Sequence, residues 1–251
     1  MTELPILHTL PSVTLSGLDE RAALMSRAEL KFMPGREMLP GLLQQLSGEY
    51  QILDINGMRA FQYHSRYFDT EDLTLYRMHT TGNKRRIKVR QRLYADTGRC
   101  YFEVKQKHGF LHTEKVRTPI TQLHDQLSEA ELLLLPAPAR WQVWLPQLHC
   151  TFTRITLCHH SHPERLTIDT DMILQHGQTI QQYPYVAVIE IKQARAERNS
   201  KALRVLRDAG LHAGPMSKYA TGIALTHPQA RYNAMKPTLM SLNKTHTQTV
   251  I

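Results

Sequence analysis

The stretch KRRIKVRQRLY, residues 84–94, carries six lysines and arginines among its first nine residues. Ile87, Val89 and Leu93 alternate with the cations, which is the period-two pattern of a β-strand with one apolar face. Side chains of alternate residues in a strand point to the same side. The pattern therefore predicts a strand with its cations on one face: Lys84, Arg86, Lys88, Arg90 and Arg92.

Two surroundings are compatible with this row of cations, an outer face in water or the inner wall of a closed sheet. Alternate residues on a strand lie about 7 Å apart. Two like charges at that distance repel by about 0.6 kcal/mol in water and by about 2.4 kcal/mol at an effective dielectric constant near 20. Water tolerates the row at little cost, whereas an enclosed wall needs a bound polyanion.

The same arrangement, apolar on one face and cationic with an occasional carboxylate on the other, recurs along the chain. It is found in the strands expected at residues 26–32, 99–107, 111–120, 164–174 and 185–193. The pair Glu-x-Lys occurs three times, at Glu29/Lys31, Glu103/Lys105 and Glu190/Lys192, and the strand at 164–174 places Arg165, Thr167, Asp169 and Asp171 on one face. For a single strand, a solvated face is the simpler explanation. The repetition favours a shared basic wall.

The remaining sequence predicts an α+β fold with a large antiparallel sheet of eight or nine strands. Tight turns such as TGN and ADTG separate the strands between residues 62 and 117, which favours antiparallel pairing. We expect short helices around residues 36–46, after the cap Ser128, in 199–210 and in 216–227. Residues 1–25 are expected to be an irregular lead-in, residues 26–226 the globular domain and residues 227–251 a flexible tail.

The composition of the chain limits the classes of partner that it can be expected to bind. The net charge of +9 on 251 residues fits nucleic acid, an anionic membrane surface or a phosphate-rich substrate. No apolar run of about 18 residues predicts a membrane span, and the N-terminus lacks the pattern of a secretory signal. Three scattered cysteines fit a reducing compartment, so we expect a cytoplasmic protein.

Plain nucleic-acid binding is the weaker interpretation. The aromatic residues near the basic strand form no repeated stacking row of the kind that single-strand binders use. Carboxylates on a cationic face would repel phosphates unless a divalent metal bridges the two, and Mg²⁺ or Mn²⁺ prefers one or two carboxylates plus substrate oxygens. Walker, GxGxxG, HExxH and CxxC motifs are absent. The run CHHSH, residues 158–162, is expected to be a loop between two strands.

Eight short motifs, in this order, resemble the VTC domain, the polyphosphate polymerase domain of the vacuolar transporter chaperone complex within the triphosphate tunnel (CYTH-like) superfamily. They are ELK (29–31), SRYFDT (65–70), KVRQRLY (88–94), FEVKQK (102–107), EKVR (114–117), ERLTIDTD (164–171), VIEIK (188–192) and SKY (217–219). The resemblance implies an antiparallel β-barrel tunnel of about eight strands with flanking helices. Its basic interior would hold a triphosphate or polyphosphate.

The resemblance also implies roles for individual residues. The catalytic cations would be Arg90, Arg92, Lys105, Arg154, Arg165 and Lys192. Further phosphate contacts would come from Lys31, Arg66, Lys88, Lys115, Arg117, Ser217, Lys218 and Tyr219. Glu190 would hold Mn²⁺ or Mg²⁺, while Glu29, Glu103 and Asp169 would bind metal or orient neighbouring cations.

The implied activity is transfer of the ATP γ-phosphate to a growing polyphosphate chain. Two alternatives remain open: a tunnel triphosphatase that hydrolyses inorganic or nucleoside triphosphate, and a non-catalytic module that binds polyphosphate or RNA. The expected partners are ATP and polyphosphate, without DNA. Eukaryotic family members carry an extra regulatory domain and membrane spans that this sequence lacks. We therefore expect a stand-alone catalytic domain beside a separate membrane protein, peripheral at the inner face of a membrane.

Overall fold

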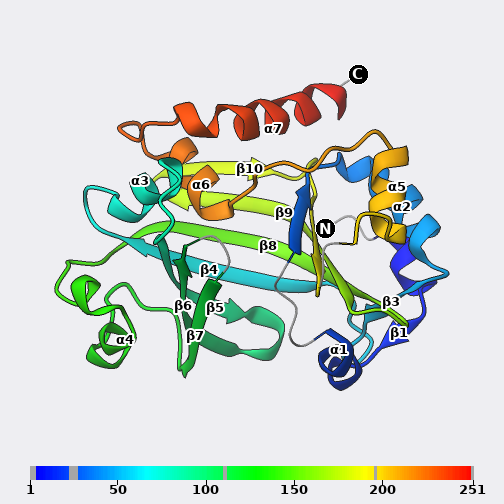
Figure 1. Cartoon of the computed structure of the whole chain (residues 1–251), viewed down its shortest axis with the longest axis horizontal. Helices are drawn as coiled ribbons and strands as arrows, with labels where there is room; N and C mark the ends of the chain where they lie inside the picture. The colour runs from blue at the N-terminus through cyan, green and yellow to red at the C-terminus, as the bar shows by residue number, and fades with distance from the viewer. Residues whose placement is uncertain (1–3, 23–27, 110–111, 195–196, 250–251) are drawn as a thin grey trace.

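A computed structural model describes residues 4–22, 28–109, 112–194 and 197–249, and a single curved sheet dominates it (Figure 1). Residues 26 and 27 of the expected first strand lie outside the described residues. The strands are β1 (Ser12–Val13), β2 (Ala28–Phe32), β3 (Tyr50–Leu53), β4 (Phe61–Asp69), β5 (Ile87–Tyr94), β6 (Arg99–His108), β7 (His112–Ile120), β8 (Leu145–His159), β9 (Glu164–His176), β10 (Thr179–Tyr183) and β11 (Val188–Gln193). Eight of them follow the order β2-β11-β9-β8-β4-β5-β6-β7, with antiparallel pairing throughout.

The sheet curls into a barrel that is open between its two edge strands. No pairing joins β2 to β7 among the described residues. Nevertheless, Glu29 and Lys31 of β2 line the same cavity as Thr113 and Lys115 of β7. The expected α+β class, an antiparallel barrel-like sheet around a tunnel with flanking helices, is confirmed.

The helices are α1 (Leu15–Ala22), α2 (Leu39–Leu46), α3 (Thr74–Thr80), α4 (Glu129–Leu133), α5 (Lys201–Asp208), α6 (Lys218–Thr226) and α7 (Lys236–Thr249). Ser128, Ser200 and Ser217 each cap a helix by accepting a hydrogen bond from a backbone N–H of its first turn. Pro40 lies in the first turn of α2, where a missing N–H leaves no bond unmade.

The apolar core lies outside the barrel, between the outer face of the sheet and the helices. Ile168, Ile189 and Ile191 pack with leucines of α2 and α5. Val89 and Phe102 belong to a second cluster that includes residues of α3 and α6. Because apolar side chains occupy the outer face, strand alternation sends the charged side chains inward.

Both chain ends differ from expectation. Within the lead-in, α1 and β1 are regular elements, β1 pairs in parallel with β3, and Leu10 and Leu18 are buried. In the tail, residues 236–249 form α7 rather than a loose segment, because Leu242 is buried in the core and Thr238 donates a hydrogen bond to the carbonyl oxygen of Pro215 (2.6 Å). With the short strands β1, β3 and β10, the sheet has eleven strands among the described residues.

No helix in the described part of the chain combines the length and the apolar character needed to cross a membrane.

Gly222 tests how tightly α6 packs on β8. A Cβ at this position would lie 2.3 Å from Leu148 Cδ2, whereas a Cβ at Gly41, on the exposed side of α2, would meet nothing within 4 Å. We expect Gly222→Ala to lower the free energy of unfolding by about 1–3 kcal/mol through overpacking. The control Gly41→Ala should raise it by about 0.5–1 kcal/mol. Denaturant unfolding measures both, and an unchanged midpoint for Gly222→Ala would contradict the packing.

Candidate functional site

Three connected cavities run through the barrel. The central chamber, of about 450 Å³, is lined by residues of β2, β4, β5, β6, β7, β8, β9, β11 and α6. It shares Lys31, Lys88 and Lys105 with a cavity of about 610 Å³ beside α3 and α7, which we call the α7-side mouth. It shares Arg92 and Arg154 with a cavity of about 420 Å³ beside α1, the α1-side mouth. The barrel is therefore a through passage.

The wall of the central chamber is strongly cationic. Its described lining contains ten lysines and arginines against three glutamates. The cations are Lys31, Lys88, Arg90, Arg92, Lys105, Lys115, Arg154, Arg165, Lys192 and Lys218, and the carboxylates are Glu29, Glu103 and Glu190. Such an excess inside a sheet requires anions from elsewhere.

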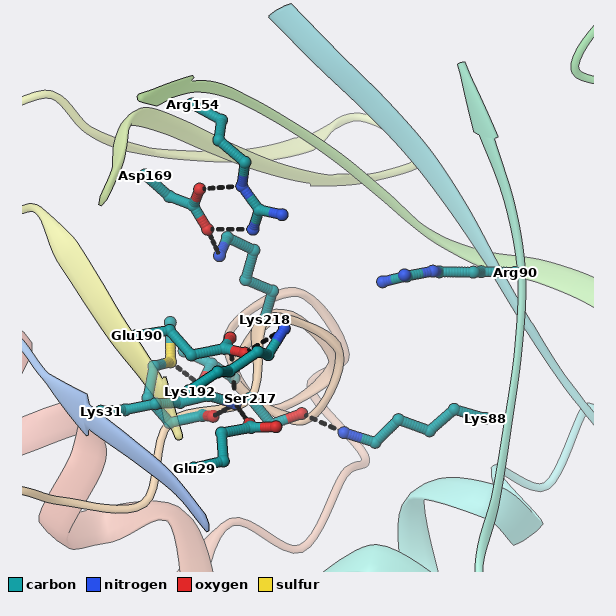
Figure 2. A network of polar contacts seen from close by, with 12 residues as sticks. Glu29, Lys31, Lys88, Arg90, Arg154, Asp169, Glu190, Lys192, Ser217 and Lys218 are labelled. Carbon is teal, nitrogen blue, oxygen red and sulfur yellow. Dashed lines mark hydrogen bonds and ion pairs between the residues drawn. The ribbon is translucent and has the colours of Figure 1, made fainter. Parts of the chain in front are cut away.

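On strands β2 and β11, acidic and basic side chains alternate at one side of the chamber (Figure 2). Their register places Glu190 opposite Lys31 and Lys192 opposite Glu29. Lys31 Nζ lies 2.7 Å from Glu29 and 3.8 Å from Glu190, and Lys192 Nζ lies 2.6 Å from Glu190. Burial alone would raise the pKa of the Glu190 carboxyl, but Lys192 and Lys31 hold it well below its ordinary value. Glu190 is thus a charged carboxylate.

A second cluster joins β5, β6 and β7 around Glu103. Its buried carboxylate accepts hydrogen bonds from Arg90 Nε (2.6 Å) and lies 2.6 Å from Lys115 Nζ. Burial would raise the pKa of Glu103, yet Arg90, Arg92 and Lys115 together lower it. Arg117 extends the cluster at 3.7 Å.

Asp169 of β9 organises the third cluster. It accepts two hydrogen bonds from Arg154, at 2.6 and 2.8 Å, and a further one from Lys218 at the start of α6 (Figure 2). Although burial would raise the pKa of Asp169, Arg154 and Lys218 lower it to about 2. The carboxylate therefore fixes two cations whose remaining N–H groups are available to an anion.

Two polar atoms on β9 are buried without a hydrogen-bond partner among the described residues. They are Arg165 Nε and Thr167 Oγ1, two positions apart on the inward face. Buried donors rarely stay unpaired in a complete structure. They therefore mark a place where a bound ligand would supply the acceptor.

Lys88 crosses the passage and donates a hydrogen bond to Ser217 Oγ at 2.8 Å (Figure 2). Burial, with Lys31 and Lys105 nearby, lowers the pKa of Lys88 to about 7. His79, at the α7-side mouth, has a pKa lowered to about 3 by burial and by Lys88 and Arg86. Lys88 is therefore only partly charged near neutral pH until an anion approaches it.

The structure brings most of the predicted site residues to this passage. Arg90, Arg92, Lys105, Arg154, Arg165, Lys192, Lys31, Lys88, Lys115, Ser217, Lys218 and Glu190 line the chamber, and Arg117 lines the α1-side mouth. Glu29 and Glu103 also line the chamber, and Asp169 binds its cations from the wall.

Four predicted positions lie elsewhere. Arg66 pairs with Asp125 and His149 on the outer face, because alternation on β4 turns Ser65 and Tyr67 inward instead. The Tyr219 hydroxyl donates to Asp69 within the core.

The other two are Asp171 and Lys84. Asp171 adopts a left-handed backbone (φ 52°) where the β8–β9 register shifts, so alternation breaks and it pairs with Arg36. Lys84 lies in the turn before β5, not in the strand. The expected loop at CHHSH holds for residues 160–162.

Aromatic rings that the sequence did not predict as part of the site lie against the arginines of the chamber. The rings of Tyr63 and Phe152 stack at 5.3 Å, and the guanidinium of Arg154 lies 5.0 Å from the Tyr63 centroid. Arg92 lies 5.4 Å from the same ring. Alternation applied to FQYHSRYFD (61–69) would have indicated Tyr63 and Tyr67, since both share a face with Ser65.

The described residues contain no group of three or more His, Cys, Asp or Glu side chains placed to hold a metal. Glu190 and Glu29 supply two carboxylates that share Lys31. Two carboxylates with substrate phosphate oxygens are the donor set that Mg²⁺ or Mn²⁺ commonly uses. The residues thus fit a metal that arrives with phosphate.

Residues 26–132 match the model of the VTC domain family, so the resemblance is confirmed over that segment. A search of curated proteins gave no significant match.

Solved structures with a similar fold include three adenylate cyclase candidates. One from Bacillus halodurans shares 15% identity and a TM-score of 0.49, covering 77% of this chain and 94% of its own. One from Hippeastrum, described with a dominant triphosphatase activity, shares 15% identity and a TM-score of 0.48, covering 80% and 97%. One from Vibrio parahaemolyticus shares 14% identity and a TM-score of 0.46, covering 79% and 99%.

The inward position of Arg90 is tested by comparison with an arginine five positions away. Arg90 points into the chamber, whereas Arg85 is exposed in the turn before β5. We expect Arg90→Ala to weaken binding of inorganic tripolyphosphate about 10- to 100-fold, the size of one or two charge-assisted hydrogen bonds. Arg85→Ala should change it by less than about twofold. Isothermal titration calorimetry measures both, and equal effects would contradict the inward wall.

We expect Lys88 to make the binding of a polyanion pH-dependent. A bound phosphate favours the ammonium form, so binding takes up a proton wherever free Lys88 is neutral. Affinity for long-chain polyphosphate should be full below pH 7 and fall by up to about tenfold per pH unit above it. Lys88→Met should bind more weakly and lose this slope. Calorimetry across pH 6–9 measures it, and an unaltered slope in Lys88→Met would show that another group titrates.

Proposed function

We propose that this protein, with its VTC-domain segment, is a metal-dependent polyphosphate polymerase that transfers the γ-phosphate of ATP to a growing polyphosphate chain. The observation that carries the proposal is the through passage, whose wall is cationic from one mouth to the other. A pocket for one triphosphate needs a single opening. A passage with basic walls at both ends suits a chain that lengthens inside it.

The cations of the wall would act on the phosphates that react. Arg90, Arg92 and Arg154 would hold γ- and chain-terminal phosphates in line, because guanidinium groups bind phosphate oxygens in a fixed geometry. An oxygen of the terminal chain phosphate would form the new bond to the γ-phosphorus. The bond from that phosphorus to the ADP oxygen would break, and ADP would leave with the electron pair.

The carboxylates would keep the wall folded and ordered between turnovers. In the free protein, Glu103 and Asp169 hold arginines that would otherwise repel one another. An incoming phosphate would bind arginines that Glu103 and Asp169 already hold in place. The positions of the charges would therefore be set before substrate arrives, which lowers the reorganisation needed for transfer.

Glu190, with Glu29 beside it, would hold Mn²⁺ or Mg²⁺ together with substrate oxygens. The metal would neutralise charge on the β- and γ-phosphates as ADP leaves. In the free protein, Lys31 pairs with Glu29 and Lys192 pairs with Glu190. Both lysines would turn towards phosphate when the metal binds.

The place of the reaction is proposed to be the cytoplasm, with ATP as phosphate donor and polyphosphate as product. Three free cysteines, all buried, fit a reducing compartment. A separate membrane protein as partner stays a prediction.

The test is incubation with ATP and Mn²⁺, followed by gel staining for long polyphosphate and by assay of free phosphate. Wild-type protein should make long chains. Glu190→Gln should lose turnover by about 100-fold or more while it keeps or gains affinity for polyphosphate, because a negative charge leaves the passage. The matched control Glu114→Gln, an exposed carboxylate next to inward-facing Lys115 on β7, should keep full turnover.

Each other outcome has a distinct meaning. Free phosphate without chains would replace the polymerase with a triphosphatase. Polyphosphate binding without any ATP turnover would indicate a binding module. Full turnover by Glu190→Gln would refute the assignment of the metal ligand.

A further inference from the structure

Asp69, the last residue of β4, is a fully buried carboxylate that joins three segments of the chain. It accepts hydrogen bonds from the backbone N–H groups of Leu75 (2.8 Å) and Tyr76 (3.0 Å) in the first turn of α3. It also accepts one from the backbone N–H of Thr70 (2.7 Å). The hydroxyl of Tyr219, in the first turn of α6, donates to the same carboxylate. One side chain therefore holds the end of a strand and the starts of two helices.

Each of these three segments supplies a residue to the passage. Tyr67 of β4 lines the central chamber, and His79 of α3 lines the α7-side mouth. Ser217 and Lys218 come directly before Tyr219 in the sequence, and both line the chamber. Asp69 itself is not among the described residues that line the three cavities. It can therefore act on the passage only through the segments that it holds.

Lys218 is the passage residue that depends most on the start of α6. Its ammonium group donates to Asp169 across the chamber wall (Figure 2). A lysine ammonium sits on a flexible four-carbon stem, so a contact at its head does not fix the rest of the side chain. A phosphate that binds Lys218 would draw the ammonium partly away from Asp169. The backbone at the start of α6 would then decide where the ammonium can reach.

The Tyr219 hydroxyl is a contact that can be removed without emptying the core. The Tyr219 ring is 2% exposed and packs against Tyr67, with 5.4 Å between the ring centroids. Phenylalanine at this position would keep the ring and lose only the hydrogen bond to Asp69. Hydrogen bonds to a charged group are stronger than those between neutral groups. Loss of this bond would therefore loosen the start of α6 while its apolar packing stays.

We propose that Asp69 and Tyr219 are positioning residues, and that the hydrogen bond between them holds the start of α6 so that Lys218 meets phosphate in the passage. The proposal rests on the proposed function, because it takes phosphate as the ligand of the passage. It deepens that function by adding two residues that touch no substrate. Capping of α3 accounts for the backbone hydrogen bonds of Asp69, but not for a hydroxyl that comes from a different helix.

The experiment measures binding of inorganic tripolyphosphate by calorimetry in a pair of matched variants. Tyr219→Phe should weaken binding about fivefold, the size of one net hydrogen bond. Tyr50→Phe is the control, because Tyr50 is also buried and donates its hydroxyl to a buried carboxylate, that of Glu164. Neither Tyr50 nor Glu164 is among the described residues that line the passage. Both variants should unfold at a lower denaturant concentration than wild type, but only Tyr219→Phe should bind tripolyphosphate more weakly.

A double-mutant cycle separates positioning of Lys218 from a general loss of stability. In a Lys218→Met background, Tyr219→Phe should change the affinity by less than about twofold, because the cation that it positions is gone. In a Lys192→Met background, the weakening by Tyr219→Phe should persist, since Lys192 lies on β11 and pairs with Glu190. A loss of stability alone would weaken binding equally in both backgrounds. Circular dichroism confirms that each variant is folded.

The outcomes separate this inference from the proposed function. Unchanged binding in Tyr219→Phe would overturn the inference, and so would equal weakening in Tyr50→Phe or full weakening in the Lys218→Met background. These three results would leave the proposed polymerase standing. If the predicted coupling is found in a protein that makes no chains from ATP, the polymerase fails and the positioning role stands. Wild-type protein that binds no tripolyphosphate would overturn both.

Discussion

The whole structure depends on the repulsion between cations that a curled sheet brings together on its inner face. Ten lysines and arginines line one chamber, and like charges 7 Å apart repel by roughly 2.4 kcal/mol at an effective dielectric constant near 20. Carboxylates on the same face offset part of this repulsion. Glu103, Asp169 and Glu190 each contact at least two cations. The unbalanced remainder leaves the chamber wall with a net positive charge.

The same constraint explains where the core lies. A sheet with a charged interior cannot fill its own barrel with apolar side chains, so its apolar face must be buried on the outside. Helices α2 and α5 cover one part of that face, and α3, α6 and α7 cover another. Helix α6 contributes to both the core and the passage. Tyr219 and Ile223 pack in the core, while Ser217 and Lys218, at the start of the helix, line the passage.

Alternation along single strands made much of the site predictable. Lys88, Arg90 and Arg92 face inward because Val89 belongs to the outer core, and that pattern is visible in the sequence itself. Local sequence patterns could not predict features that depend on strand register or on packing between distant segments. Asp171 leaves the inner face because the register with β8 shifts there, and α7 is ordered because Leu242 finds a pocket in the core. Arg66 was misplaced by motif resemblance, although alternation with Ser65 and Tyr67 argued against it.

The central claim is that phosphates bind along the inner wall between the carboxylate-held cations. A crystal structure with inorganic tripolyphosphate tests it most directly. The account predicts phosphate oxygens within hydrogen-bonding distance of Arg90, Arg154 and Arg165 Nε, with Glu103 and Asp169 still holding their arginines. Tripolyphosphate on the outer surface, with the chamber filled only by water, would contradict it.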